Sequence, residues 1–107
     1  MTNKPIVIMN TMDCPPEDDE EFNKWYTKHA SALFKFKGMK SITRYKKIGE
    51  DPNVPLYVAI YHFDKQEDLE QYLKSPEREA GIKIPGRPES VKIRFHSQFE
   101  IMQEWKK

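Results

Sequence analysis

Residues 55–73 read PLYVAIYHFDKQEDLEQYL, and this stretch decides the fold more than any other. Its first half, residues 55–63, is rich in β-branched and aromatic side chains and predicts a strand. Asp64 and Glu67 follow with the spacing of a capping box, which predicts that a helix starts at once. Leu69 and Tyr72 lie three residues apart, as on the inner face of such a helix. The stretch therefore predicts a strand that runs directly into a helix.

The residues upstream predict a strand, a helix and a second strand. Residues 6–9 form a short apolar run typical of a buried strand. The acidic residues 17–21 suit the start of a helix, because the helix dipole favours negative charge there. Gly38 is expected to close this helix as a left-handed cap, before a strand over residues 39–48. One apolar stripe at three- and four-residue spacing marks the inner face of the helix: Phe22, Trp25, Tyr26, His29 and Leu33.

The residues downstream predict one more strand. Ser75-Pro76 either ends the second helix or starts a short third one, with Ser75 as its cap. Residues 91–101 alternate between apolar and polar side chains, which predicts a last strand with one wet face. On that alternation His96 lies on the wet face, against solvent or a dimer interface.

The predicted order is strand, helix, strand, strand, helix, strand within a single domain, residues 1–107. This order predicts an α+β, ferredoxin-like βαββαβ sandwich, with a four-stranded antiparallel sheet and two helices on one face. The other face of the sheet is then bare. An exposed apolar sheet face usually marks an interface, so we expect a homodimer in which two such faces pair into a dimeric α+β barrel.

Charge and composition exclude several classes of partner. The chain has 18 basic and 17 acidic residues, so no bulk field attracts it to DNA or to anionic lipid. Basic residues do cluster over residues 35–47, a pattern that could bind nucleic acid. We favour the alternative, in which they lie on a solvated helix end and on an edge strand protected by its lysines. No apolar stretch approaches transmembrane length. Cys14 is the only cysteine, which rules out an internal disulfide and makes a cytoplasmic location the expectation.

The sequence resembles a known family. Residues 22–29, FNKWYTKH, are similar to the signature of the first helix in EthD-like proteins, a branch of the dimeric α+β barrel superfamily. Gly38 with Arg44-Tyr45, and the strand over residues 56–64, resemble the passage that follows in that family. The resemblance implies the fold and the dimer. Relatives include cofactor-independent isomerases, polyketide cyclases and monooxygenases, and in the first two groups pocket histidines perform acid–base chemistry.

Two histidines are the candidates for catalysis. His29 lies on the apolar helix stripe, where an imidazole can act as a general acid or base. The alternative is a core histidine that bonds a backbone carbonyl and packs like an aromatic residue. His62 is the second candidate, but alternation lets only His62 or Tyr61 border the pocket. The aliphatic neighbours of His62 favour its face as core, whereas Phe63, on the face of Tyr61, should staple onto the second helix.

Four aromatic residues are the candidates for holding a flat, oxygenated substrate: Trp25, Tyr26, Tyr45 and Tyr61. Their alternative role is ordinary aromatic core. The histidine spacing matches no metal motif, so neither a metal nor another cofactor is expected. Two functions remain open from the sequence. One is a cofactor-free isomerase, cyclase or monooxygenase that acts on a small aromatic or polyketide-like compound; the other is a non-catalytic dimeric module that binds a metabolite or a protein.

Overall fold

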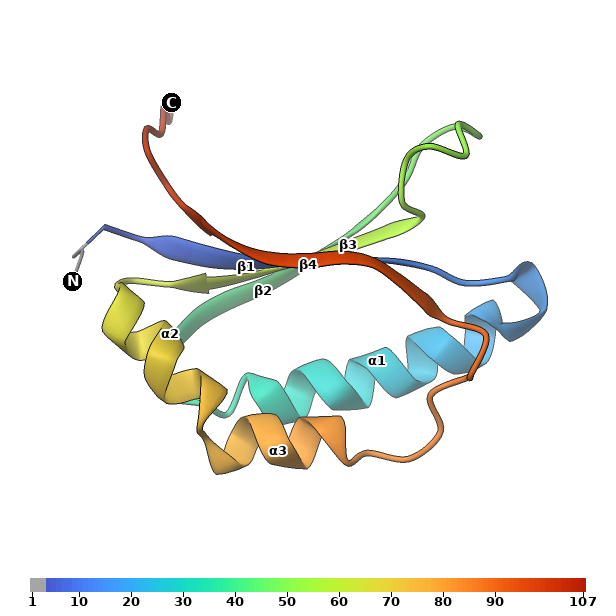
Figure 1. The fold of residues 1–107 in the computed structure, drawn as a ribbon, viewed down its shortest axis with the longest axis horizontal. Helices are drawn as coiled ribbons and strands as arrows, with labels where there is room; N and C mark the ends of the chain where they lie inside the picture. The colour runs from blue at the N-terminus through green and yellow to red at the C-terminus, as the bar shows by residue number, and fades with distance from the viewer. Residues whose placement is uncertain (1–3) are drawn as a thin grey trace.

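The structure is a computed structural model that describes residues 4–107 (Figure 1). Four strands and three α-helices alternate along these residues. The strands are β1 (Ile6–Asp13), β2 (Met39–Lys46), β3 (Tyr57–Phe63) and β4 (Lys92–Glu100). The helices are α1 (Asp19–Leu33), α2 (Gln66–Leu73) and α3 (Pro76–Ile82), and a short 3-10 turn, η1 (Pro16–Asp18), precedes α1.

The strands form one antiparallel sheet in the order β2-β3-β1-β4. Figure 1 shows all three helices on one side of this sheet, while the β2–β3 hairpin and the C-terminal segment rise on the other side. This arrangement confirms the predicted ferredoxin-like α+β fold. The third helix is the short one that Ser75-Pro76 left open: the Ser75 side chain caps it by accepting a hydrogen bond of 3.1 Å from the Arg78 amide.

The two faces of β3 differ in burial, and this settles which face meets the helices. Tyr57, Ala59, Tyr61 and Phe63 are buried, whereas the residues between them are only half-buried. Phe63 packs against Tyr72 of α2, with ring centroids 5.3 Å apart. The prediction that Phe63 packs onto the second helix is therefore confirmed, and the prediction that the aliphatic side of β3 meets the helices is wrong. Tyr61 faces the helices, and His62 faces the open side.

A β-bulge between β1 and β4 changes which side chains face the helices. Thr11 pairs with Phe95 and Met12 pairs with Ile93, so Arg94 lies between two paired positions, and its guanidinium forms an ion pair of 2.9 Å with Asp13 of β1. The Thr11 hydroxyl lies at this point, accepting a hydrogen bond from the Phe95 amide and donating one to its carbonyl. The extra residue reverses the alternation along β4. The bulge turns His96 to the helix side of the sheet, so the predicted face was wrong, but the side chain is exposed to solvent as expected.

Two predicted helix boundaries are also corrected. Lys65 precedes the first residue of α2, and among the described residues no side chain caps that helix, so Asp64 and Glu67 do not form a capping box. Gly38 has no left-handed backbone; α1 ends at Leu33 and a turn leads through Gly38 to β2. The acidic start of α1 is confirmed, since Asp19, Glu20 and Glu21 lie in its first turn.

A glycine lets α3 approach α1 closely. A Cβ atom at Gly81 would lie 2.5 Å from Leu33 Cδ2 and 3.3 Å from the His29 carbonyl oxygen. Only a residue without a side chain fits there. The close approach matters for the site, because it brings the backbone of α3 within reach of the His29 side chain.

Candidate functional site

A cavity of about 320 Å³ lies between the helices and the covered face of the sheet. Apolar walls come from α1, α3, β1 and β4, including Phe22, Leu33, Ile82 and Ile93. Polar groups also converge on it, which is typical of ligand pockets rather than of plain core. The polar and ionisable residues that line it are Asn10, Tyr26, His29, Tyr61, Tyr72, Arg78, Arg87 and His96.

His29 is fixed in one orientation by contacts on both sides of its ring. Its Nδ1 lies 2.7 Å from the carbonyl oxygen of Gly81, and since a carbonyl only accepts, Nδ1 carries the proton. The ring stacks on Trp25, with centroids 4.5 Å apart and planes 15° apart. Burial lowers the pKa of His29, and the charge of Arg87 lowers it further, against the opposing effect of the Gly81 hydrogen bond. The imidazole is therefore neutral at pH 7, with Nε2 as a proton acceptor.

Trp25 holds its place through its indole nitrogen. Nε1 donates a hydrogen bond of 2.8 Å to the carbonyl oxygen of Ile84, in the loop after α3. The indole ring thereby ties α1 to that loop and forms, together with His29, a stacked pair of aromatic rings at the cavity. Arg87 lies on the same loop, with its guanidinium carbon 5.9 Å from the centre of the indole ring.

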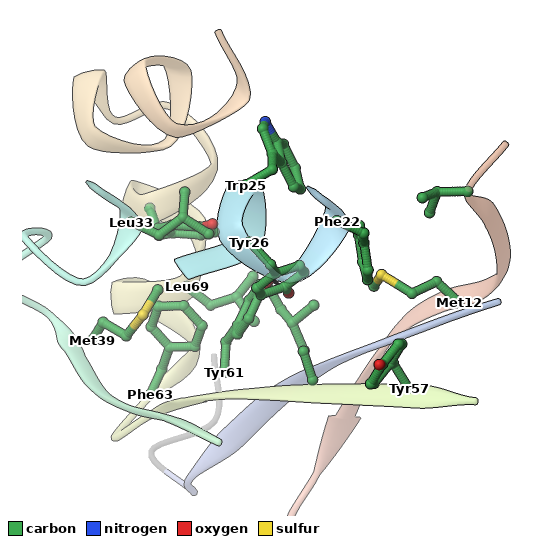
Figure 2. Close-up of a cluster of buried hydrophobic side chains, with 14 of the residues drawn as sticks. Met12, Phe22, Trp25, Tyr26, Leu33, Met39, Tyr57, Tyr61, Phe63 and Leu69 are labelled. Carbon is green, nitrogen blue, oxygen red and sulfur yellow. Dashed lines mark hydrogen bonds between the residues drawn. The ribbon is translucent and has the colours of Figure 1, made fainter. Parts of the chain in front are cut away.

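Two buried tyrosine hydroxyls meet at the sheet end of the cavity. Tyr26 of α1 and Tyr61 of β3 point toward one another and share a hydrogen bond (Figure 2). Burial raises the pKa of both phenols, that of Tyr61 well above its ordinary value, so both keep their protons at neutral pH. One of the two protons lies between the oxygens. The other remains available to donate to a bound oxygen atom.

Asn10 of β1 lies beside this tyrosine pair and affects the pKa of both phenols. Its Oδ1 is buried and has no hydrogen-bond partner among residues 4–107. A buried acceptor without a partner is costly, so this oxygen favours a ligand or a water molecule that donates to it. The cavity therefore offers a phenol donor and an amide acceptor close together.

A cation supports the tyrosine pair from the other side. The guanidinium of Arg44 on β2 lies over the ring of Tyr26, 4.2 Å from its centroid, and near the ring of Tyr57 at 5.1 Å. Such a cation–π contact fixes the tilt of the Tyr26 ring. Its charge also works against the rise in pKa of Tyr26 and Tyr61 that burial causes.

The structure brings four of the six predicted site residues together. His29, Trp25, Tyr26 and Tyr61 all line the cavity. His62 does not, because it pairs with Val7 on the open face of the sheet. Tyr45 pairs with Val58 on that same open face and is 52% exposed. His62 and Tyr45 therefore do not join His29 in one pocket.

Five polar lining residues were missed as site residues by sequence reasoning, and one of them, Tyr72, was expected only on the inner face of the second helix. Asn10 occupies the inward position two residues after Ile8, and that alternation was a usable signal. The position of His96 could not be predicted because it depends on the β-bulge, and no glycine in the sequence marks that bulge. Arg78 and Arg87 lie on α3 and on the loop after it, and only the folded chain brings them over the cavity.

Two kinds of feature are absent from the described part of the chain. Residues 4–107 hold no group of three or more histidine, cysteine or acidic side chains placed to bind a metal ion. Within the same residues, no helix is both long enough and apolar enough to cross a membrane.

Comparison with solved structures supports the fold. SnoaB, a cofactor-independent oxygenase from Streptomyces nogalater, is similar with a TM-score of 0.71 and 16% identity, over 97% of this chain and 99% of that one. An ethyl tert-butyl ether (EthD) family protein from Bacillus halodurans gives 0.64 and 17%, over 92% and 99%. A dimeric ferredoxin-like protein of unknown function from Thermobifida fusca gives 0.62 and 13%, over 94% of each chain. At these identities the likeness shows the fold alone.

Sequence comparison gives a more specific result. No curated protein matches the chain significantly. One family model matches residues 6–84, which extend from the first residue of β1 to the loop after α3 and include His29, Tyr26 and Tyr61. Since the match covers most of the 107 residues, the chain belongs to the family described as Domain of unknown function (DUF4286).

Proposed function

We propose that this protein binds a small, flat, oxygenated molecule in the cavity between its helices and sheet, and that His29 acts on it as an acid or base without a cofactor. The observation that carries the proposal is the state of His29. Its Nδ1 is committed to the Gly81 carbonyl, and its neutral Nε2 belongs to a ring that lines the cavity. A base held in one tautomer and one orientation is what proton abstraction requires.

The remaining polar groups supply the other half of such a reaction. When Nε2 takes a proton from a carbon next to a carbonyl, the C–H electron pair forms a C=C bond and negative charge moves to the carbonyl oxygen. The free proton of the Tyr26–Tyr61 pair is a donor for that oxygen. Preorganised donors aimed at developing charge are usually the largest contribution to such catalysis. Return of the proton to another carbon would complete an isomerisation. In a cyclisation, the enolate carbon would instead form a C–C bond to a second carbonyl carbon of the same molecule, and the oxygen of that carbonyl would take the proton.

The alternative function is a non-catalytic binding module. The observation in its favour is that the hydrogen bond from His29 to Gly81 joins α1 to α3, which is a sufficient structural reason for a histidine at this position. In that case the same cavity binds a metabolite and nothing reacts. The two functions share the ligand site and differ only in the role of Nε2.

The homodimer and the cellular location belong to the same proposal. The open face of the sheet carries Val7, Met9, Val58, Ile60, Phe95 and Phe99. A second copy of the chain is the partner that we propose for this face, in the manner of a dimeric α+β barrel and of the EthD-like proteins that the sequence resembles. The solved structure from Thermobifida fusca, itself described as dimeric, supports this choice. The single cysteine, Cys14, is buried and suits a reducing cytoplasm.

Hydrogen exchange in 2-tetralone tests the catalytic proposal. This flat ketone has acidic protons next to its carbonyl, and their replacement in D2O is followed by proton NMR. We expect the protein to accelerate the exchange about 10²–10⁴-fold, the usual range for one general base. His29→Ala should abolish the acceleration, while His62→Ala, a matched change on the open face, should keep it. Binding of the ketone without acceleration would favour the non-catalytic module.

A further inference from the structure

We infer that the cavity selects an organic anion, a flat ring system that carries a carboxylate, with the ring against Trp25 and His29 and the carboxylate between Arg78 and Arg87. This inference rests on the proposed ligand site and names the class of molecule that the site takes. It does not depend on whether His29 catalyses a reaction.

The charge around the cavity carries the inference. Arg78 and Arg87 both line it, and among residues 4–107 none of the lining residues is acidic. The chain as a whole is nearly neutral, with 18 basic and 17 acidic residues, so this one-sided lining is local. A cleft lined by charge of one sign concentrates ligands of the opposite sign.

The two guanidinium groups are also uncommitted. Other charged side chains of the described surface do form ion pairs, such as Lys83 with Glu79 on α3 itself. In the described residues, neither Arg78 nor Arg87 has an ion pair or a side-chain hydrogen bond. A guanidinium offers five donors in a planar fork that matches a carboxylate, and here those donors are free.

The aromatic surface beside the arginines sets the shape of the ligand. Trp25 and His29 are stacked nearly parallel, and the guanidinium of Arg87 lies 5.9 Å from the indole centre. A fused ring that packs against the outside of this stacked pair places a carboxylate attached to it within the reach of the same arginine. At the far end of the cavity, the Asn10 Oδ1 acceptor and the tyrosine pair meet a hydroxyl or carbonyl oxygen on the ring.

Two matched probes test the inference: the anion 2-naphthoate and its neutral amide, 2-naphthamide. They share the same fused ring system and differ in charge. Titration calorimetry at low salt measures both affinities, and amide NMR spectra show whether the signals of Trp25 and Tyr26 move. We expect 2-naphthoate to bind at least 10-fold more tightly than the amide, and the difference to shrink as salt is added. The double variant Arg78→Gln/Arg87→Gln should remove the difference, chiefly by weakening the binding of 2-naphthoate.

A control variant and three contradicting outcomes separate failure of the anion preference from failure of the ligand site. Lys28→Gln removes one positive charge from the exposed side of α1, away from the cavity, and should keep the preference for the anion. Equal binding of the two probes would overturn the selection of anions and leave the proposed ligand site standing. A preference for naphthoate that survives loss of both arginines would also overturn it. Failure of both probes to bind at millimolar concentration would contradict the ligand site and the inference together.

Discussion

Each face of the sheet carries some residues that its exposure does not account for. The covered face lies under three helices, yet it carries Tyr61, Asn10 and His96, all of which line the cavity. The uncovered face carries polar residues such as His62 and Tyr45, but also apolar side chains, with Phe95 41% and Phe99 46% exposed. A polar group within a core and an exposed apolar patch are the informative exceptions to the usual distribution of residues.

These residues separate two tasks on one small sheet. A buried polar group is costly unless something satisfies it, so the buried and unpartnered Oδ1 of Asn10 on the covered face indicates a ligand site. Exposed apolar side chains are costly in a different way, since they favour association, and they indicate a partner surface. Because β3 contributes alternate residues to each face, adjacent residues such as Tyr61 and His62 serve different tasks.

The largest expected effect comes from a charge on the open face. Ile60 pairs with Met9 at the middle of β3, so a lysine there would place a charge within the open face that we propose as the dimer interface. We expect Ile60→Lys to weaken the dimer by roughly 10²-fold or more, because each interface would bury two unpaired charges. Sedimentation velocity over a range of concentrations measures the change.

Gln71→Lys supplies the matched control for that experiment. Gln71 is exposed on α2, on the helix side, and the same substitution there should leave the dimer unchanged. A stable dimer has a Kd well below roughly 100 µM. If the unaltered protein sediments as a monomer at about that concentration, the open face is not a surface for a second copy.

A smaller effect is expected from the hydroxyl groups of the covered face. Tyr61→Phe leaves the Tyr26 hydroxyl buried without its partner, and we expect a loss of about 1–3 kcal/mol in the free energy of unfolding. Tyr45→Phe removes the same atom from the open face, where the side chain is 52% exposed, and should cost less than about 0.5 kcal/mol. Urea unfolding at fixed protein concentration measures both.

The coupling of the two tyrosines sharpens this comparison. Because Tyr26→Phe and Tyr61→Phe each break the same hydrogen bond, the double variant should lose less stability than the sum of the single variants. Additive losses would mean that the hydroxyls act independently and that the shared hydrogen bond contributes nothing.

The fold was predictable from the sequence because its signals are local. Residues 55–73 carry both the strand alternation and the helix spacing, and the order of elements follows from short-range pattern alone. His29 was found for the same reason, since a polar ring on an apolar helix stripe is visible within one helix.

The rest of the site depends on events that local pattern does not encode. The bulge at Arg94 arises from pairing between β1 and β4, whose paired residues lie more than 70 positions apart, and it turns His96 inward. The contact of His29 with Gly81 needs α3 to approach α1 within a distance that only glycine allows. The sequence offered two roles for His29, a catalytic base or a backbone-bonded core residue. The structure has features of both roles: Nδ1 bonds the backbone carbonyl of Gly81, and the ring lines the cavity.

The smallest effect is a pH dependence that belongs to His29. Burial holds its pKa below the ordinary 6.5, so between 6.5 and the folded value the unfolded chain binds more protons than the folded chain. The free energy of unfolding therefore rises with pH in that interval. This contribution is fully present above 6.5 and is lost as the pH falls to the folded pKa. His29→Gln has no titrating group at this position, so its stability relative to the unaltered protein should improve as the pH is lowered from 7.5 to 5.

The other shifted groups lie outside this window, which keeps the measurement clean. For Asp13, burial opposes the change, but the hydrogen bonds from Leu56 and Arg94 lower its pKa from 3.8, so its effect appears at more acidic pH. The tyrosines on the covered face act above pH 10, because burial raises their pKa. Urea unfolding of both proteins at pH 7.5, 6.5 and 5.5 gives the comparison, and His96→Gln, which keeps His29, should retain the pH dependence. A stability difference that stays constant, or that grows on acidification, would mean that the His29 ring is not held neutral, and the acceptor at Nε2 would be lost as the basis for proton abstraction.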